Sequence, residues 1–201
     1  MKIKKKFLDT NIKNKSKTIK EKIQFVFYDG KKLPLPTEIE ISESGVCNRK
    51  CSFCPRSAPD FNEVKEFIDE NLYKKLCHEL KEYDYKGTIR FSGFVEPLLD
   101  KNIFNLISIT RAYLPKSNIE IVTNGDPLNL KRLQKLFYSG LNRLLISSYD
   151  GEKETKALEN LCKEAKLNES QYLVRRRYLS EDQDFGITLS NRAGLMENAE
   201  F

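Results

Sequence analysis

Three cysteines with close spacing are the residues in this chain best suited to chemistry. Cys47, Cys51 and Cys54 follow the pattern Cys-x3-Cys-x2-Cys. A short loop can turn three thiolates at this spacing onto one face of a small inorganic cluster. An iron–sulfur cube normally takes four protein ligands, so three cysteines would leave one iron open to a substrate or cofactor. The other two cysteines, Cys77 and Cys162, fall in expected helices beside leucines, and we expect both to be small buried core residues.

The same thiols could instead belong to a structural zinc site. Structural zinc usually takes four cysteine or histidine ligands, arranged in two pairs. The only histidine of the chain, His78, lies on a separate expected helix, which leaves the three cysteines one ligand short. A zinc module therefore stays as an alternative, and three unrelated cysteines are the least expected interpretation at this spacing.

Around this loop the sequence alternates between strand and helix patterns. Residues 37–42 alternate apolar and polar side chains, which predicts a strand that leads directly into the cysteines. Apolar residues that recur every four positions predict a helix over 63–83. The further elements we expect are strands at 23–30, 88–92, 119–125, 143–151, 171–179 and 185–194, an extended linker at 31–36, and helices at 103–114, 128–140 and 152–167.

Strands that alternate with helices at these intervals predict an α/β fold, a parallel sheet with helical crossovers. The expected strands end in polar or glycine-containing segments. In parallel α/β folds the loops that follow the strands converge at one edge of the sheet, where ligands bind. We therefore expect these loops and the three cysteines to line one site.

The cysteine pattern, with the aromatic Phe53 before its third member and a strand before its first, resembles the radical S-adenosylmethionine (radical SAM) enzymes. The resemblance implies that Cys47, Cys51 and Cys54 hold a 4Fe–4S cluster. It implies that S-adenosylmethionine chelates the fourth iron and is cleaved reductively to a 5′-deoxyadenosyl radical, which abstracts hydrogen from a substrate. It also implies the architecture, a partial (open) TIM-like parallel β/α barrel of about six strands.

The loop after the second expected strand of the barrel, Ser-Gly-Phe-Val-Glu-Pro at 92–97, resembles the Gly-Glu-Pro element of the family. The resemblance implies that Gly93 and Glu96 hold the methionyl ammonium of the cofactor. Glycine lets the backbone approach closely, and a carboxylate accepts hydrogen bonds from an amine. Val95 departs from the family pattern, which commonly has glycine there. Taken alone, the segment could be a solvent-exposed turn.

Two later loops resemble further cofactor-binding elements of the family. Thr-Asn-Gly at 123–125 implies a place for Asn124 near the ribose or the carboxylate, although Asn-Gly is also a common turn. Ser-Ser-Tyr-Asp-Gly at 147–151 implies a serine near the ribose or the methionyl group. Strand alternation should turn one of its two serines inward, and we favour Ser148 because it stands two residues before the aspartate.

Three consecutive arginines fall in the expected strand 171–179. Alternation puts Arg175 and Arg177 on one face of this strand and Arg176 on the other. An arginine that points inward could pair with the cofactor carboxylate through two parallel hydrogen bonds. The alternative is a strand edge with solvated arginines.

Positive charge is concentrated at the N-terminus. Residues 1–22 carry nine lysines against Asp9 and Glu21, so the formal charge of +6 leaves the rest of the chain almost neutral. We expect residues 1–22 to be a flexible basic segment rather than an arm for an acidic partner or membrane surface. A nearly neutral body predicts no nucleic-acid partner. We further expect a short strand and linker over 23–36 and the radical SAM core over 37–201.

No apolar run approaches the ~20 residues that span a bilayer, and no apolar segment of a secretory signal follows the basic start. Free cysteines without an export signal favour the cytoplasm. The prediction is thus a cytoplasmic radical SAM enzyme that acts on an unidentified substrate with an electron donor of the flavodoxin or ferredoxin type.

The chain resembles SPASM-type members of the family but lacks their C-terminal extension, since no cysteine follows Cys162. This motivates an alternative function. The chain could be a non-catalytic or truncated iron–sulfur-binding barrel that acts with a partner protein.

Overall fold

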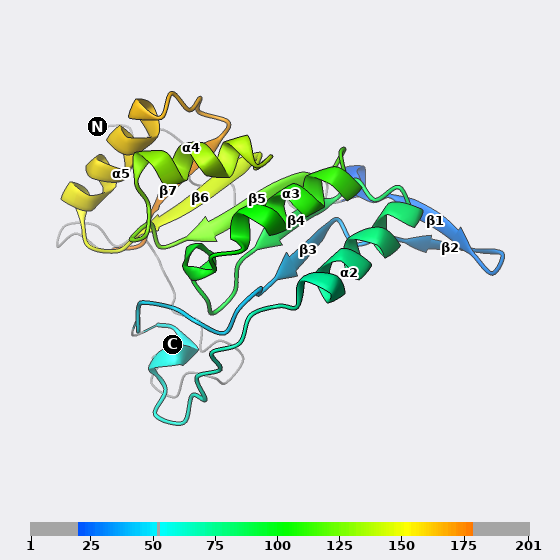
Figure 1. Ribbon diagram of the computed structural model, residues 1–201, viewed down its shortest axis with the longest axis horizontal. Coiled ribbons are helices and arrows are strands. Elements are labelled where there is room, and N and C mark those ends of the chain that lie inside the picture. Colours follow the sequence, from blue (N-terminus) through cyan, green and yellow to red (C-terminus); the bar gives the residue numbers. More distant parts are fainter. Residues whose placement is uncertain (1–19, 52, 179–201) are drawn as a thin grey trace.

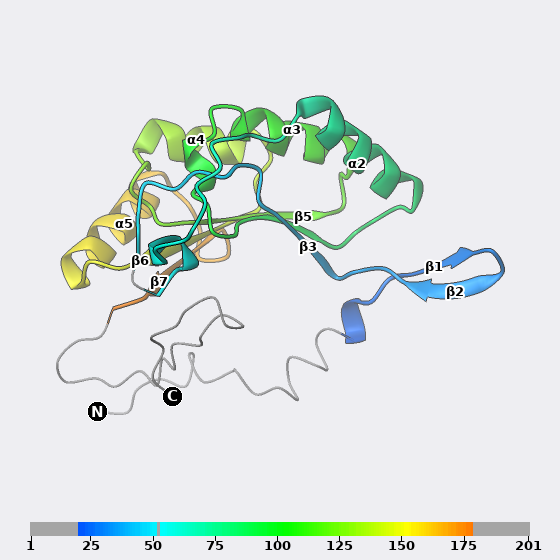
Figure 2. The same cartoon turned by 90° about the horizontal axis from the view of Figure 1, so that it is seen from below.

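The computed structural model describes residues 20–51 and 53–178. A parallel sheet with the strand order β3-β4-β5-β6-β7 forms the centre of the molecule (Figure 1). Helices join successive strands and cover one face of the sheet (Figure 2). The strands are β3 (Glu38–Ile41), β4 (Thr88–Phe91), β5 (Asn118–Thr123), β6 (Arg143–Ser148) and β7 (Tyr172–Arg176), and the helices are α2 (Glu70–Glu82), α3 (Ile103–Tyr113), α4 (Leu130–Tyr138) and α5 (Glu152–Glu164).

This is the expected α/β class, an open TIM-like parallel barrel. Five parallel strands are present in the described part of the chain, and the sixth expected strand, 185–194, lies outside it. The expected basic segment 1–22 also lies almost wholly outside the described residues. None of the described helices combines the length and the apolar character that crossing a bilayer requires.

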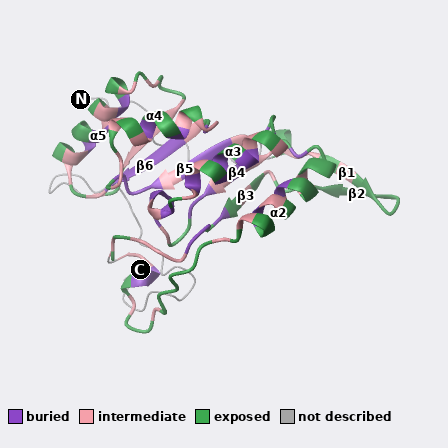
Figure 3. Ribbon diagram, viewed as in Figure 1, coloured by how far each residue is buried: buried purple, intermediate pink, exposed green. Residues whose placement is uncertain are grey.

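The face of the sheet toward the helices forms the apolar core. Ile89, Ile119, Ile121 and Ile146 alternate along their strands and are buried against the helices (Figure 3). Each buried side chain of this size contributes about 1.5–3 kcal/mol relative to an exposed one. Burial of this face therefore fixes which residues of each strand point to the other face, the inside of the barrel.

The inner face carries charge where a closed barrel would carry packed aliphatic side chains. Glu40, Arg90, Glu120 and Arg143 are neighbours in register across β3, β4, β5 and β6. Arg90 donates to Glu120, with Nη2 2.7 Å from Oε2, and also pairs with Glu38. We call this inner face the lumen; its polar lining suits a polar ligand.

Helix α2 begins at Glu70, seven residues later than the periodicity predicted. The Asp69 carboxylate accepts a hydrogen bond from the backbone N–H of Leu72 and so caps the helix. The preceding residues are extended because they pair with the chain after β3: the N–H of Ile68 donates to the carbonyl of Glu43 at 2.7 Å. This tertiary pairing overrides the local helical pattern. Leu72, one of the apolar residues with four-residue spacing, lies in α2 and is 60% exposed.

Residues 31–34, expected as part of a linker, form a second strand instead. Strands β1 (Phe25–Tyr28) and β2 (Lys31–Pro34) pair antiparallel as a hairpin. Asp29 and Gly30 both have positive φ, as a tight two-residue hairpin turn requires. The hairpin projects from one end of the sheet, far from the cysteine loop (Figure 1).

Candidate functional site

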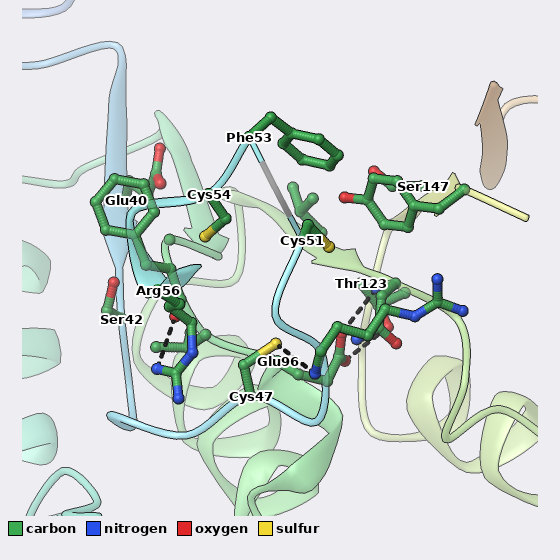
Figure 4. A pocket seen from close by; sticks show the side chains of 17 residues that line it. Glu40, Ser42, Cys47, Cys51, Phe53, Cys54, Arg56, Glu96, Thr123 and Ser147 are labelled. Atoms are coloured by element: carbon green, nitrogen blue, oxygen red, sulfur yellow. Dashed lines mark hydrogen bonds between the residues drawn. The ribbon is translucent and has the colours of Figure 1, made fainter. Parts of the chain in front are cut away.

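A cavity of about 470 Å³ opens where the parallel strands end (Figure 4). The loop after β3 supplies the three cysteines, and the loops after β4, β5 and β6 supply the rest of the wall. The lining includes Cys47, Cys51, Cys54, Gly93, Glu96, Asn124, Ser147 and Tyr149. The expected convergence of the strand-end loops on one site is therefore present in the structure.

The three cysteines are half-buried free thiols on this wall. The N–H of Cys54 donates to the carbonyl of Cys51 at 2.9 Å, which turns the second half of the loop back on itself. The N–H of Arg49 points at the Sγ of Cys47, 3.5 Å away. Burial raises the pKa of the Cys47 and Cys51 thiols above the usual range. Binding to a metal would offset this, because metal ligation deprotonates a thiol.

The donor set suits a three-thiolate cluster better than a zinc ion. Ligands of one zinc ion must stand within about 4 Å of one another, given a zinc–sulfur bond of about 2.3 Å. Among the described residues, no three Cys, His, Asp or Glu side chains converge in a way that could hold a single metal ion. The three thiols that line this cavity are one ligand short of a structural zinc site, whereas an iron–sulfur cube could be held by three thiolates with its fourth iron left open.

An arginine inside the cysteine loop ties it to the loops after β5 and β6. Arg49 donates from Nε and Nη2 to both oxygens of Asp126, at 2.6 and 2.5 Å. The same guanidinium reaches Asp150 at 2.9 Å and Glu154 at 3.1 Å. The hydrogen bond to Arg49 lowers the pKa of Asp126. We call these four residues the Arg49 clamp.

The clamp carries no local motif and was missed by sequence analysis. The available signal was positional, because Asp126 and Asp150 follow adjacent parallel strands at the edge where the cysteines lie.

Asn124 lies on the cavity wall and is hydrogen-bonded to Asn48 of the cysteine loop. Its Nδ2 donates to the Oδ1 of Asn48 at 2.7 Å, and its Oδ1 accepts from the N–H of Asp126 at 3.0 Å. Asn48 in turn donates to Asp126 at 2.6 Å. The side chain of Asn124 therefore already has partners on both of its ends, which makes it a positioning group at the site.

Glu96 is 1% exposed and joins the loop after β4 to the end of β5. Its carboxylate accepts hydrogen bonds from Thr123 Oγ1 at 2.6 Å, from the N–H of Asn124 at 2.7 Å and from the N–H of Leu98 at 3.1 Å. Burial raises the pKa of Glu96 despite these bonds. A carboxylate has about four acceptor sites, so three bonds leave room for one more donor from the cavity.

Gly93 is needed for the close approach of the β3 and β4 loops. Its φ is +131°, and a Cβ at this position would stand 2.1 Å from the Oγ of Ser42. Ser42 Oγ donates to the carbonyl of Ser92 at 2.9 Å, which fixes the contact. Val95 also lines the cavity, so the departure from Gly-Glu-Pro adds an apolar side chain to this wall.

Of the two serines that end β6, Ser147 lines the cavity and Ser148 does not. Ser148 is fully buried on the helix side, where its Oγ lies 2.7 Å from Glu154 and 2.9 Å from Thr155. Alternation along β6 places the two serines on opposite faces of the sheet. The spacing to Asp150 favoured Ser148 as the serine that faces the cavity, whereas Ser147 is the one that does. Ser148 instead supports α5.

The arginines of β7 divide as the alternation predicts. Arg175 is the register partner of Ser147 and shares its face of the sheet. Arg176 is exposed on the opposite face, 3.5 Å from Glu152. The inward-facing arginine of this strand is therefore Arg175.

Residues 41–176 match the family model of the Radical SAM superfamily. The chain belongs to this superfamily. It is 34% identical over 160 residues to the S-adenosyl-L-methionine-dependent 2-deoxy-scyllo-inosamine dehydrogenase of Niallia circulans. The matched region covers 80% of this chain and 60% of that protein. It is 25% identical over 114 residues to GTP 3′,8-cyclase of Mycobacterium sp. (strain KMS), over 56% of this chain and 32% of that protein.

Solved structures agree with this family. The crystal structure of BtrN in complex with AdoMet and 2-DOIA matches with a TM-score of 0.69 and 30% identity, over 83% of this chain and 64% of that one. BtrN in an open conformation matches with a TM-score of 0.56 and 29% identity, over 71% of this chain and 57% of that one. The chain thus spans about three fifths of the length of these relatives. Membership of the superfamily implies S-adenosylmethionine and a 4Fe–4S cluster as cofactors, and radical SAM enzymes need a reductant.

Proposed function

We propose that Cys47, Cys51 and Cys54 hold the 4Fe–4S cluster and that the enzyme cleaves S-adenosylmethionine to a 5′-deoxyadenosyl radical, which removes hydrogen from a substrate in the lumen. The observation that carries this proposal is the shared cavity. Three thiols from one loop and polar groups from the next three strand ends line it together. The cofactor supplies the radical chemistry, and the protein supplies binding, orientation and exclusion of water.

The residues of the cavity divide the binding of the cofactor between them. Glu96 offers its remaining acceptor site to the methionyl ammonium, beside the backbone of Gly93. Asn124 holds the cysteine loop in place through Asn48 and presents the rest of its surface to the cavity. On β6 we assign the cofactor contact to Ser147 in place of Ser148.

For the substrate we propose a hydroxylated ring that loses hydrogen from a carbinol carbon. The Niallia circulans relative is named for dehydrogenation of 2-deoxy-scyllo-inosamine, and the lumen here presents charged and polar side chains such as Glu40 and Arg90. Hydroxyl groups of a ring can exchange hydrogen bonds with water for hydrogen bonds with such a wall. The reductant we propose is a flavodoxin- or ferredoxin-type donor.

Anaerobic reconstitution followed by product analysis tests the function. The unmutated protein should bind about four irons and four sulfides and, with dithionite and S-adenosylmethionine, should form 5′-deoxyadenosine. The triple variant Cys47→Ala, Cys51→Ala, Cys54→Ala should bind almost no iron. Cys162→Ala is the matched control, because this buried thiol lies in the core away from the cavity and iron content should stay normal.

Two outcomes would contradict the proposal. Stoichiometric zinc without visible absorbance in protein purified without air would favour the zinc module. Normal iron without cleavage of the cofactor would favour the non-catalytic iron–sulfur barrel.

A further inference from the structure

One guanidinium in the lumen has two buried nitrogens without a partner among the residues that the structure describes. Nε and Nη2 of the half-buried Arg175 are inaccessible to solvent, and neither makes a hydrogen bond to a residue in 20–51 or 53–178. These two nitrogens donate from the same edge of the planar group, so an entire bidentate edge is left unfilled.

Two other arginines of this protein show what normally occupies that edge. Arg49 uses Nε and Nη2 to bind both oxygens of Asp126. Arg90 uses the same two nitrogens to bind one oxygen of Glu120, at 3.1 and 2.7 Å. In both cases the edge holds a carboxylate, which is the geometry that an arginine fork matches best.

Arg175 lies on the face of the sheet that borders the cavity. Its register partner Ser147 lines the cavity, and its charge acts on Tyr149, which lines the cavity as well. The lumen carboxylate whose charge acts on Arg175, Glu120, is already used, since it accepts from Arg90 and from Asn118 at 2.8 Å.

An unpaired buried cation is costly for the folded chain. Burial lowers the pKa of Arg175 to about 10, so the group keeps its proton at neutral pH, and no carboxylate of the described residues forms an ion pair with it. Isolated charges persist inside proteins when they are paired or when they serve a site. A ligand that brings its own negative charge would remove this cost on binding.

We propose that Arg175 binds an oxyanion, a carboxylate or a phosphate, carried by the substrate of this enzyme. The inference rests on the proposed function, because it places that oxyanion on the ring whose carbinol carbon is attacked. Arg175 is then a specificity-determining residue that selects an acidic ring over a neutral one.

Calorimetry on the anaerobically reconstituted full chain, with S-adenosylmethionine present, tests this directly. The probes are inositol monophosphate, glucuronate and uncharged inositol, which distinguish a phosphate from a carboxylate and from the bare ring. At least one charged probe should bind about tenfold or more tightly than inositol. Arg175→Met should weaken that probe by about ten- to a hundredfold, as expected for the loss of a charged hydrogen bond.

Arg176→Met is the matched control, because it removes the neighbouring guanidinium from the exposed face of the same strand. It should leave the affinity of every probe unchanged. The inference is overturned if neither charged probe binds more tightly than inositol, or if Arg175→Met and Arg176→Met lose the same affinity for the charged probe. A loss of S-adenosylmethionine affinity in Arg175→Met would also overturn it, since the guanidinium would then serve the cofactor.

A second measurement decides the case in which Arg175→Met binds none of the probes. It is the thermal unfolding temperature of each variant without probes. An unpaired charge gives no net stabilisation, so Arg175→Met should unfold at a temperature no lower than Arg176→Met. A clearly lower temperature would mean that Arg175 has a partner in the folded protein, and the inference would fail. Formation of 5′-deoxyadenosine by the unmutated protein reports separately on the proposed function.

Discussion

The carboxylate of Glu96 has two candidate roles, bracing two loops and binding the ammonium group of the cofactor. A single substitution distinguishes them. It braces the β4 and β5 loops through three hydrogen bonds, and it faces the cavity with one acceptor site to spare. A brace needs hydrogen-bond acceptors, whereas an ammonium site needs the negative charge as well.

Glu96→Gln should therefore weaken binding of S-adenosylmethionine by about ten- to a hundredfold while iron content stays near normal, because the negative charge is lost while the size of the side chain and one acceptor oxygen are kept. Thr123→Val is the matched control. It removes the 2.6 Å hydrogen bond to Glu96 but leaves the carboxylate charged, so its effect should be much smaller. Titration of both reconstituted variants with S-adenosylmethionine makes the comparison. An equal loss of affinity in the two variants would show that Glu96 only holds the loops together and does not bind the ammonium group.

At the scale of elements, the cysteine loop depends on its neighbours for its shape. Between Cys47 and Cys51, the residues Asn48 and Arg49 are hydrogen-bonded to the loops after β5 and β6. Without these contacts the first half of the loop would lose its hydrogen bonds to the neighbouring strand ends, and the thiols of Cys47 and Cys51 would be held less firmly.

Arg49→Met should make the cluster several-fold easier to remove by an iron chelator, because it releases three carboxylates and loosens the loop at once. Lys50→Met is the matched control: Lys50 is exposed, and Glu63, 3.5 Å from its Nζ, is its one carboxylate partner among the described residues. Loss of visible absorbance after addition of the chelator measures both rates. Equal rates would mean that the Arg49 clamp does not position the ligands.

Sequence periodicity located most elements but not their long-range partners. The helix expected at 103–114 is observed at Ile103–Tyr113, because its apolar pattern and its packing agree. The start of α2 was misplaced because residues 66–68 pair with 43–45, which no local pattern reveals. The phase of β6 was also missed, since one residue of shift exchanges Ser147 for Ser148 on the cavity wall.

The candidate site was predictable where it depends on spacing and unpredictable where it depends on ion pairs. The cysteines, Gly93 and Glu96 stand in short motifs, and all of them line the cavity. Arg49 meets carboxylates 77 to 105 residues away in the sequence, and the sequence contains no rule that pairs them.

Stability of the whole molecule should depend on pH through its buried carboxyls. Glu43, Glu96 and Asp100 are all buried, and burial raises the pKa of each. For Glu43 the pKa rises from 4.5 to about 7, and one oxygen, Oε2, has no hydrogen-bond partner in the described part of the chain. The unfolded chain therefore releases this proton at lower pH than the folded chain does.

A raised pKa stabilises the folded state fully below pH 4.5, and the benefit is lost as the pH rises through about 7. Glu43→Gln cannot ionise, so its free energy of unfolding relative to the unmutated protein should increase by about 2–3 kcal/mol between pH 5 and pH 8. Urea unfolding of both reconstituted proteins measures this. The exposed Glu79→Gln is the control and should change nothing, and parallel curves for Glu43→Gln would refute the prediction.

The Arg49 clamp also sets an order of events during synthesis. Arg49 leaves the ribosome 105 residues before its partner Glu154, and 77 residues before Asp126. While those residues are missing, the nascent chain already displays all three thiols but cannot fasten the loop between them. If the three cysteines hold the cluster as proposed, insertion of the cluster into the fastened loop has to wait until α5 has been translated.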